Sequence, residues 1–443
     1  MDTARWCLLD FLGCILGSSF MEGETRRLAG FVHSLGDREE ATVPGLGLRT
    51  SCRSAALAYG TMAEMLEFQD TYGYAAYHPA SCIIPAALAV AEANHQSGGE
   101  FLAAVVAGYE ASMRIGAAVG QSCVNKGFMS TGTLGTFGAA VAAGKLLGLD
   151  SAGLADAMGI AGYLLPFSMA EDSLGGYSVR TVNGGHAART GIEAALMALN
   201  GYTGSHRILE GSANPDWGFC SMAGGPHDLS RITGGLGDYY YIKEISFKQY
   251  PCCGLPQTAV EAVIELKATH QLQPSQVEKV LVRTYASAVS RVGSNYPTSA
   301  SSFAACQFSM PYLMAAAIKH GQITLRQFAP DNIHDPEVLE LSARVQTVED
   351  SELTRLASEG ARPSIVEVTT RNGSHLSNRV EFRKGDPVRP LTDQELLAKF
   401  RRLAAEALSE DQSRRCEELA LGMEDVKDVA ELVSACNYPR ARS

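Results

Sequence analysis

The stretch Gly138-Ala-Ala-Val-Ala-Ala-Gly144 sets the pattern for the first half of the chain. It lies inside an apolar run that predicts a helix over residues 136–147, and its small side chains let a second helix approach closely. Apolar residues three and four apart predict further helices over residues 6–16, 54–68, 86–95, 101–119 and 154–161. We therefore predict a helical domain from residue 1 to 245.

The character of the sequence changes near residue 240. Aromatic and β-branched residues predict strands over 239–248 and 277–285, with a helix over 257–270 between them. Residues 364–371 and 374–382 flank Asn372-Gly373, the favoured two-residue hairpin turn. We predict a smaller α/β domain over residues 246–389, and helices over 390–443 that return to the first domain. The expected fold class is mainly α, with a large all-helical domain and a smaller α/β domain.

Composition limits the classes of function. The chain has 443 residues, 46% of them hydrophobic, which is enough for two cores. Its net charge of −11 argues against binding nucleic acid. Eleven cysteines without a regular framework, and a start without signal-peptide features, indicate a reducing compartment. The longest apolar stretches, 83–91 and 101–108, are too short to span a bilayer. We expect a cytoplasmic protein with no nucleic-acid or membrane partner.

Several common site motifs are missing from the sequence. No Gly-Lys-Ser/Thr phosphate loop occurs, and the glycines at 132, 135 and 138 lack both dinucleotide spacing and a preceding strand. Cys252 and Cys253 are adjacent, and no paired Cys or His spacing of the zinc type occurs. No Gly-x-Ser-x-Gly elbow is present. We therefore predict no nucleotide cofactor, no structural zinc and no serine hydrolase.

Polar residues gather in residues 68–80, Phe-Gln-Asp-Thr-Tyr-Gly-Tyr-Ala-Ala-Tyr-His-Pro-Ala, between two helical runs. Pro79 restricts the backbone of His78, and a histidine fixed in this way suits a catalytic base near neutral pH. The alternative is a structural His-Pro turn.

The sequence resembles the MmgE/PrpD family at six segments in family order. They are residues 7–14, Cys-Leu-Leu-Asp-Phe-Leu-Gly-Cys; 68–79, with Asp-Thr and His-Pro; 127–140, with Gly-Phe and Gly-Thr-Phe-Gly-Ala-Ala; 184–191, Gly-Gly-His-Ala-Ala-Arg-Thr-Gly; 248–253, Lys-Gln-Tyr-Pro-Cys-Cys; and 308–312, Phe-Ser-Met-Pro-Tyr. The resemblance implies a helical domain, an α/β lid, an active site in the cleft between them, a homodimer and small polycarboxylate substrates. It implies no metal or other cofactor for the decarboxylase and epimerase members.

The resemblance also implies roles for individual residues. His78, Lys248 and Tyr312 match catalytic positions, and Asp70, Thr71 and Arg180 match positions that bind substrate. His78 would move a proton next to a carboxylate, and Lys248 would hold a carboxylate or an enolate-like intermediate.

Three of these residues have alternatives. Lys248 could instead be a solvated lysine, Tyr312 could be packed in an apolar helix, and Asp70 could cap a helix or orient His78. Arg180 stands where the family usually has lysine, so it can clamp a carboxylate but cannot shuttle a proton.

Three departures from the family pattern affect the predicted site. Met129 and Gln257 stand where relatives have histidine, and a histidine expected near Asn183 is absent. Methionine cannot transfer a proton. We retain Met129 and Gln257 as pocket residues, and His186 as a substitute ligand or a packing residue at a helix start.

The predicted function is a lyase that dehydrates or decarboxylates a small or alkyl-substituted di- or tricarboxylate. One alternative is an epimerase or isomerase of a dicarboxylate such as iminodisuccinate. The other is a catalytically degraded homologue that binds a carboxylate.

Overall fold

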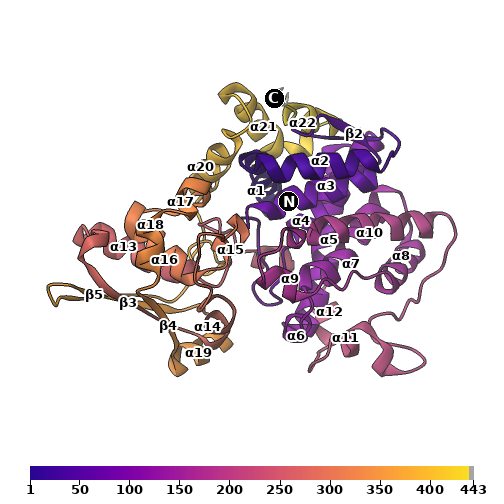
Figure 1. Cartoon of the computed structure of the whole chain (residues 1–443). Coiled ribbons are helices and arrows are strands. Elements are labelled where there is room, and N and C mark those ends of the chain that lie inside the picture. Colours follow the sequence, from indigo (N-terminus) through magenta and orange to yellow (C-terminus); the bar gives the residue numbers. More distant parts are fainter. Residues whose placement is uncertain (439–443) are drawn as a thin grey trace. The chain divides into compact units, whose positions relative to one another are not determined.

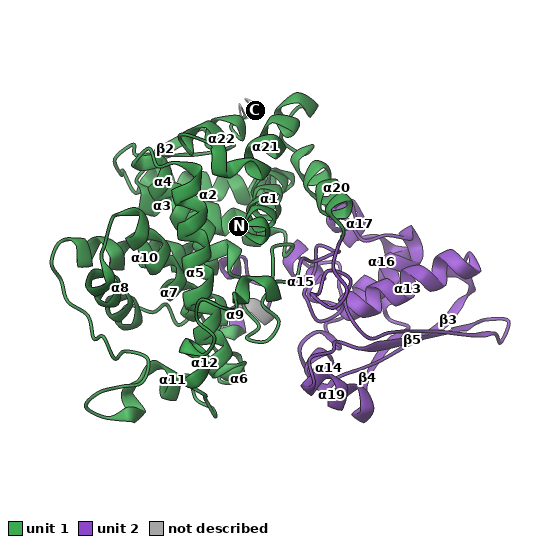
Figure 2. Cartoon of the chain, turned by 180° about the vertical axis from the view of Figure 1, so that it is seen from behind, with its two compact units in different colours: residues 1–170, 181–246, 392–443 green, residues 171–180, 247–391 purple. Residues whose placement is uncertain are grey.

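The computed structural model describes residues 1–438, except for the side chains of residues 173 and 174. Contacts divide the chain into two compact units (Figure 2). Unit 1 contains residues 1–170, 181–246 and 392–443, and unit 2 contains residues 171–180 and 247–391. The unit boundaries fall at 246/247 and 391/392, and residues 171–180 group with unit 2 although they lie within the predicted helical domain.

Unit 1 is built mainly from helices, whose order along the chain can be followed in Figure 1. Its α-helices are α1 (Asp2–Gly17), α2 (Glu22–Ser34), α3 (Cys52–Met65), α4 (Ala80–Ala93), α5 (Gly98–Val119), α6 (Ser122–Asn125), α7 (Ser130–Leu146), α8 (Ser151–Tyr163), α10 (Val182–Leu199), α11 (Phe219–Met222), α12 (Ser230–Thr233), α20 (Asp393–Ala404), α21 (Glu410–Leu421) and α22 (Ala430–Ala435). Short 3-10 helices lie at Ser18–Phe20, Pro215–Trp217, Tyr241–Glu244 and Met423–Asp425. The short helix α9 (Ala170–Leu174) crosses the boundary into unit 2.

Small residues bring the central helices of unit 1 into backbone contact. A Cβ atom at Gly60 of α3 would lie 2.5 Å from the Cα of Gly185 in α10. A Cβ atom at Gly108 of α5 would lie 2.6 Å from the carbonyl oxygen of Gly138 in α7. These spacings leave no room for a side chain, so the Gly/Ala pattern acts through close helix packing, as predicted.

Two features of unit 1 differ from the predicted helices and strands. The strands β1 (Ala41–Val43) and β2 (Leu48–Thr50) form an antiparallel pair within the otherwise helical unit. The strand predicted over residues 239–248 is wrong, because residues 241–244 form a 3-10 helix. Buried Arg114 of α5 donates to the carbonyls of Gly234 and Tyr239, so side-chain contacts replace the strand pairing expected from the tyrosines.

Unit 2 is a four-stranded sheet in the order β4-β3-β5-β6. The strands are β3 (Val277–Thr284), β4 (Val345–Glu349), β5 (Ser364–Thr370) and β6 (His375–Val380). β3 is parallel to β4 and antiparallel to β5, which is antiparallel to β6. The helices are α13 (Gln257–His270), α14 (Ala286–Val292), α15 (Phe303–Gln307), α16 (Met310–His320), α17 (Pro330–Ile333), α18 (Pro336–Ser342) and α19 (Ser351–Ser358), with 3-10 turns at Pro274–Gln276 and Leu325–Phe328. A further 3-10 turn, Ser178–Thr181, crosses the boundary between the units. Helices α13 and α16 pack together against the strands (Figure 1), so the core of this unit lies under them.

The hairpin β5–β6 forms as predicted, but its turn differs. Gly373 has a φ of +86°, whereas Asn372 is not among the residues with positive φ. The amide N–H of Gly373 donates to the carbonyl of Thr370 at 2.8 Å. The connection is therefore a three-residue loop with glycine in the left-handed region, not the two-residue turn.

Among residues 1–438, α5 is long and apolar enough to cross a membrane, and 78% of its most apolar stretch is buried. The bent pair made by residues 2–20 and 22–34, with 102° between its halves, meets the same criterion. The burial of α5 is that of a core helix, since its contacts are with α7 and other helices of unit 1.

Candidate active site

The turn that joins α3 to α4 carries the predicted histidine. Helix α3 ends at Met65, and Glu67 has a φ of +51°, a left-handed conformation that is uncommon for a residue with a side chain. Thr71 then exchanges backbone hydrogen bonds with Ser246 at 2.9 Å in each direction. This bridge anchors the middle of the turn to a distant part of unit 1 just before His78.

His78 is held through one ring nitrogen. Its Nδ1 lies 2.7 Å from the carbonyl oxygen of Asp70 and 3.2 Å from Oγ1 of Thr71. A carbonyl oxygen only accepts hydrogen bonds, so we assign the proton of the neutral ring to Nδ1. Nε2 then carries the lone pair, and it lies 4.0 Å from Oε1 of Glu67. The side chain of His78 is 18% exposed. With Nδ1 held and the lone pair on Nε2, the ring has the orientation that a general base requires.

Asp70 acts on His78 through its backbone rather than through its carboxyl group. The carboxyl group is fully buried and accepts hydrogen bonds from the N–H of Ala80 (3.0 Å) and the hydroxyl of Tyr109 (2.9 Å). Burial raises its pKa to about 7, although the Ala80 N–H opposes the shift. The side chain of Asp70 therefore caps α4 while its carbonyl orients the imidazole. This is the alternative role considered above, and the contacts do not support direct substrate binding by this carboxyl group.

Sequence reasoning missed Glu67 and Thr131. Both are buried: Glu67 faces Nε2 of His78, and Thr131 Oγ1 accepts from the backbone N–H of His78 at 3.3 Å. Glu67 follows the end of a helix, where a glutamate usually lies in solvent. The one sequence feature that could have indicated a role for Glu67 is its position directly before Phe68, where the family segment begins.

The N-termini of three long helices meet beside His78. A Cβ atom at Gly184 in α10 would lie 2.5 Å from Oγ of Ser81 in the first turn of α4. A Cβ atom at Gly132 in the first turn of α7 would lie 2.6 Å from Oδ1 of Asn183 in α10. The N–H groups at helix N-termini favour negative charge.

Two polar atoms in this region have no hydrogen-bond partner within residues 1–438. They are Oγ of Ser130 and Oδ1 of Asn183, and both are buried. Ligands and water often satisfy such atoms.

Met129 immediately precedes α7 and is half-buried. Its backbone N–H donates to the carbonyl of Ser168 at 2.8 Å, next to the bridge between Phe128 and Met169. The thioether therefore stands one residue before Ser130 and two before Thr131. Its predicted place in the pocket stays a prediction.

His186 behaves differently from both of its predicted roles. It lies on α10 and is exposed, whereas Gly184, Gly185 and Ala187 are buried. A helix residue on the exposed face cannot be packed at the helix start. The charged groups that act on His186 are Arg189 and Glu193 of its own helix, so its role as a substitute ligand beside His78 is not supported.

In unit 2, Lys248 is buried, with 4% of the residue exposed. The loop after it is fastened by Gln257 at the start of α13. The Gln257 side chain accepts from the N–H of Tyr250 at 3.2 Å and donates to its carbonyl at 2.9 Å. We predicted Gln257 as a substrate contact, but its amide group is used to hold this loop.

Arg180 is buried and stacks on an aromatic ring of the same unit. Its guanidinium carbon lies 4.7 Å from the ring centroid of Phe308. The carbonyl of the neighbouring Gln307 accepts from the N–H of Cys253 at 3.0 Å. Unit 2 thus connects Arg180, the loop after Lys248 and the Phe-Ser-Met-Pro-Tyr segment through short contacts.

Tyr312 is fully buried in α16. Its hydroxyl donates to the carbonyl of Gln327, and its ring lies 5.9 Å from that of Phe328. Burial also raises its pKa well above the usual value. These contacts favour the packing alternative, and they do not support the predicted catalytic role of Tyr312.

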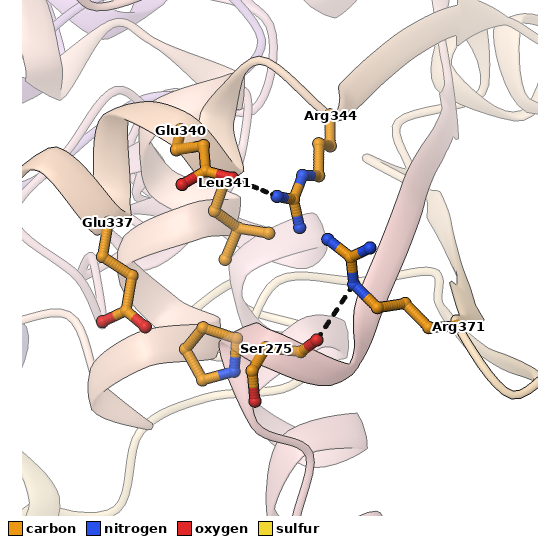
Figure 3. A pocket seen from close by; sticks show the side chains of 7 residues that line it. Ser275, Glu337, Glu340, Leu341, Arg344 and Arg371 are labelled. Carbon is orange, nitrogen blue, oxygen red and sulfur yellow. Dashed lines mark hydrogen bonds and ion pairs between the residues drawn. The ribbon is translucent and has the colours of Figure 1, made fainter.

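A separate pocket of about 310 Å³ lies in unit 2 and includes Arg344 and Arg371 (Figure 3). Arg344 pairs with Glu340, and Arg371 donates to the carbonyl of Ser275. None of the predicted site residues lines this pocket.

Comparisons with known proteins agree with the six segments. The model of the MmgE/PrpD N-terminal domain matches residues 1–231, and that of the MmgE/PrpD C-terminal domain matches residues 250–425. The chain is 27% identical to a cis-aconitate decarboxylase of Aspergillus terreus, over 99% of this chain and 92% of the relative. It is 26% identical to the Homo sapiens cis-aconitate decarboxylase (87% and 79%) and to a 2-methylcitrate dehydratase of Cupriavidus necator (83% and 77%). The chain belongs to the MmgE/PrpD family.

Proposed function

We propose that this protein is a lyase that acts on a small or alkyl-substituted di- or tricarboxylate, with His78 as the proton-transfer residue. The observation that carries the proposal is the orientation of His78. Nδ1 donates to the Asp70 carbonyl, so Nε2 is the basic atom, and it faces the carboxylate of Glu67 at 4.0 Å. A buried carboxylate at this distance stabilises the imidazolium that forms when Nε2 takes a proton.

Two lyase reactions use such a group. In a dehydration, Nε2 removes a proton from the carbon next to a carboxylate, and the C–H electrons form a double bond. The hydroxyl on the neighbouring carbon receives that proton from His78 and leaves as water with the C–O electrons. In a decarboxylation, the C–C bond to a carboxylate breaks, CO₂ leaves and the electron pair stays on the substrate. His78, protonated before the reaction, then donates a proton to the carbon. The relatives named decarboxylase and dehydratase carry out one or the other, so both reactions remain within the proposal.

Anionic substrates need positive charge at the site. In unit 1 the converging N-termini of α7 and α10 supply it through backbone N–H groups, next to the unpartnered Ser130 Oγ, whose hydroxyl can donate to a carboxylate. In unit 2 we assign Lys248 and Arg180 to substrate carboxylates. Their burial supports this role, since a desolvated cation binds a carboxylate more strongly than an exposed one.

Met129 favours an alkyl-substituted substrate. A half-buried thioether stands where relatives have an imidazole, and it packs against an alkyl group better than against a carboxylate. Gln257 also replaces a histidine, but it does not bear on this inference, because its amide holds the loop after Lys248.

The test is turnover of a substrate panel by the purified full chain. Cis-aconitate, 2-methylcitrate, longer alkylcitrates and iminodisuccinate would each be incubated with the protein, and products would be followed by mass spectrometry. Loss of CO₂ or water from one of the first three supports the lyase. Epimerisation of iminodisuccinate leaves its mass unchanged, so it would be followed by circular dichroism, and its detection would favour the isomerase. Thermal stabilisation without any turnover would favour the carboxylate-binding homologue.

We also propose a cytoplasmic homodimer. Exposed aromatic side chains on unit 1, including Tyr163, Tyr202 and Trp217, offer apolar surface to a second copy. The eleven cysteines form no regular framework in the sequence, which supports a reducing compartment. A mass near twice 47.1 kDa by light scattering, and activity in the cytoplasmic fraction, are the expected results.

A further inference from the structure

Lys399 is a buried lysine of α20, in the part of the chain that returns to unit 1 after unit 2. Its side chain is 5% exposed. The ammonium lies 2.6 Å from Oδ1 of Asp10 in α1 and donates to the carbonyl of Phe68 at 2.8 Å. It also lies 3.9 Å from the centre of the Phe68 ring. One cation thus joins α1, α20 and the turn before His78.

The carbonyl that Lys399 holds lies between the two groups that contact His78. Glu67, on one side, faces Nε2, and Asp70, two residues further on, accepts from Nδ1. Glu67 adopts the left-handed backbone conformation, which persists only where the surroundings impose it. Lys399 holds the carbonyl of Phe68, the residue that directly follows Glu67.

Stability alone does not explain this ion pair. Burying an ammonium and a carboxylate costs desolvation energy, and apolar residues of similar volume usually serve a core as well or better. What an apolar pair could not provide is a hydrogen bond to the Phe68 carbonyl. The hydrogen bond from Lys399 therefore fixes the orientation of the Phe68 carbonyl in this turn.

We propose that Lys399, together with Asp10, is a positioning residue for His78. The pair fixes the turn from Glu67 to Asp70, so that Nδ1 keeps its proton on the Asp70 carbonyl and Nε2 stays directed at the reacting proton. This inference rests on the proposed function of His78 but can be tested without substrate.

The kinetic test replaces both charges, so that neither remains buried alone. Asp10→Leu/Lys399→Met should lower kcat by about 10- to 100-fold, because small displacements of a catalytic group are costly, while KM changes less than threefold. The acid limb of the pH–rate profile should also move. The control is Arg401→Met/Glu417→Gln, which removes an ion pair between Arg401 of α20 and Glu417 of α21. It should leave kcat unchanged.

The second test observes His78 directly. The chain has ten histidines, and in protein labelled with [¹⁵N]histidine the signals of His78 are those lost in His78→Ala. The wild type should show the Nδ1–H tautomer, and the double variant should show a mixture of tautomers. Lys399→Arg keeps a charge beside Asp10 and provides a folded variant if the double variant does not fold. It should shift the same signals.

These outcomes separate the two proposals. A folded double variant with wild-type kcat and unchanged His78 signals would overturn the positioning role, as would unchanged signals in Lys399→Arg. A wild type that converts no substrate would defeat the proposed lyase, whereas the tautomer measurement would still report whether Lys399 holds the histidine.

Discussion

The two units use their predicted polar residues in different ways. In unit 1, the Asp70 carbonyl and the Thr71 hydroxyl contact Nδ1 of His78, and Nε2, which faces a buried carboxylate, is left for the chemistry. In unit 2, the Gln257 amide donates a hydrogen bond to the backbone carbonyl of Tyr250, and the Tyr312 hydroxyl donates to that of Gln327. A match to a family motif therefore does not distinguish a residue that reacts from a residue that holds the site in shape. The variants below test that separation.

The largest expected effect is that of His78→Ala. Loss of a general base typically costs a factor of about 10²–10⁴ in rate, so kcat should fall by that range with the fold intact. Initial rates on the substrate found in the panel, with circular dichroism of the variant, provide the measurement. His206→Ala, which removes a surface histidine paired with Asp156, is the matched control. A rate within tenfold of wild type would remove His78 from the mechanism.

Lys248→Met should act mainly on binding. A hydrogen bond to a charged group contributes about 1.5–3 kcal/mol, so KM should rise roughly 10- to 100-fold. Lys248→Arg should recover part of the loss, and exposed Lys243→Met should have no effect. An unchanged KM for Lys248→Met would mean that unit 2 supplies its charge from elsewhere.

Asp70→Asn should change how stability depends on pH. The pKa of Asp70 is raised from 3.8 to about 7 by burial, so between these values the folded protein holds a proton that the unfolded chain releases. The wild type should therefore lose stability as pH rises from 4 to 7, by about 1.4 kcal/mol per pH unit at most. The variant lacks this loss. Its free energy of unfolding in urea, relative to that of wild type, should therefore increase as the pH rises from 4 to 7.

Asp350→Asn is the control for this measurement. Hydrogen bonds from the Leu353 N–H and from Arg283 lower the pKa of Asp350, so it is ionised in both folded and unfolded chains above pH 5. Its difference from wild type should be constant from pH 5 to 8. The same constancy for Asp70→Asn would contradict a raised pKa at Asp70.

Tyr312→Phe should affect stability more than rate. Removing the hydroxyl leaves the Gln327 carbonyl without this donor, which costs about 1–3 kcal/mol in unfolding free energy. We expect kcat to stay within threefold of wild type. If kcat fell by a hundredfold while urea unfolding was unchanged, the catalytic role predicted from the motif would be restored.

The smallest effect is expected for His186→Ala. The residue is exposed on α10, and surface substitutions usually change stability by less than about 0.5 kcal/mol. Rates measured on the same substrate should match wild type within twofold. A large rise in KM would return His186 to the site.

Local features of the fold could be predicted from the sequence. Helix α13 spans the predicted residues 257–270, because Pro256 precedes it and Gln271 ends it in the left-handed conformation. The strand predicted over 239–248 is wrong, since Tyr239 and Tyr241 pack edge to face and the Arg114 guanidinium lies over the Tyr241 ring. Composition indicates which secondary structure a segment favours, whereas its tertiary contacts decide which one it adopts.

The candidate site shows the same limit. Asp70, Thr71 and His78 lie within nine residues, so their grouping could be predicted, and the capping role of Asp70 was among the alternatives. Glu67 was missed because its burial depends on the helices around it. Lys399 could not be found from sequence patterns, since it contacts a carbonyl 331 residues earlier in the chain.

The return of the chain to unit 1 at residue 392 has a consequence for biosynthesis. A ribosome that has made residues 1–390 has already produced Glu67, Asp70 and His78, but not the helix whose lysine holds their turn. Domains tend to fold as their sequence emerges, yet this one must wait for the whole α/β segment to be translated before α20 arrives. Catalytic competence would then be acquired last, so a prematurely terminated chain would carry every proton-transfer residue and still be inactive.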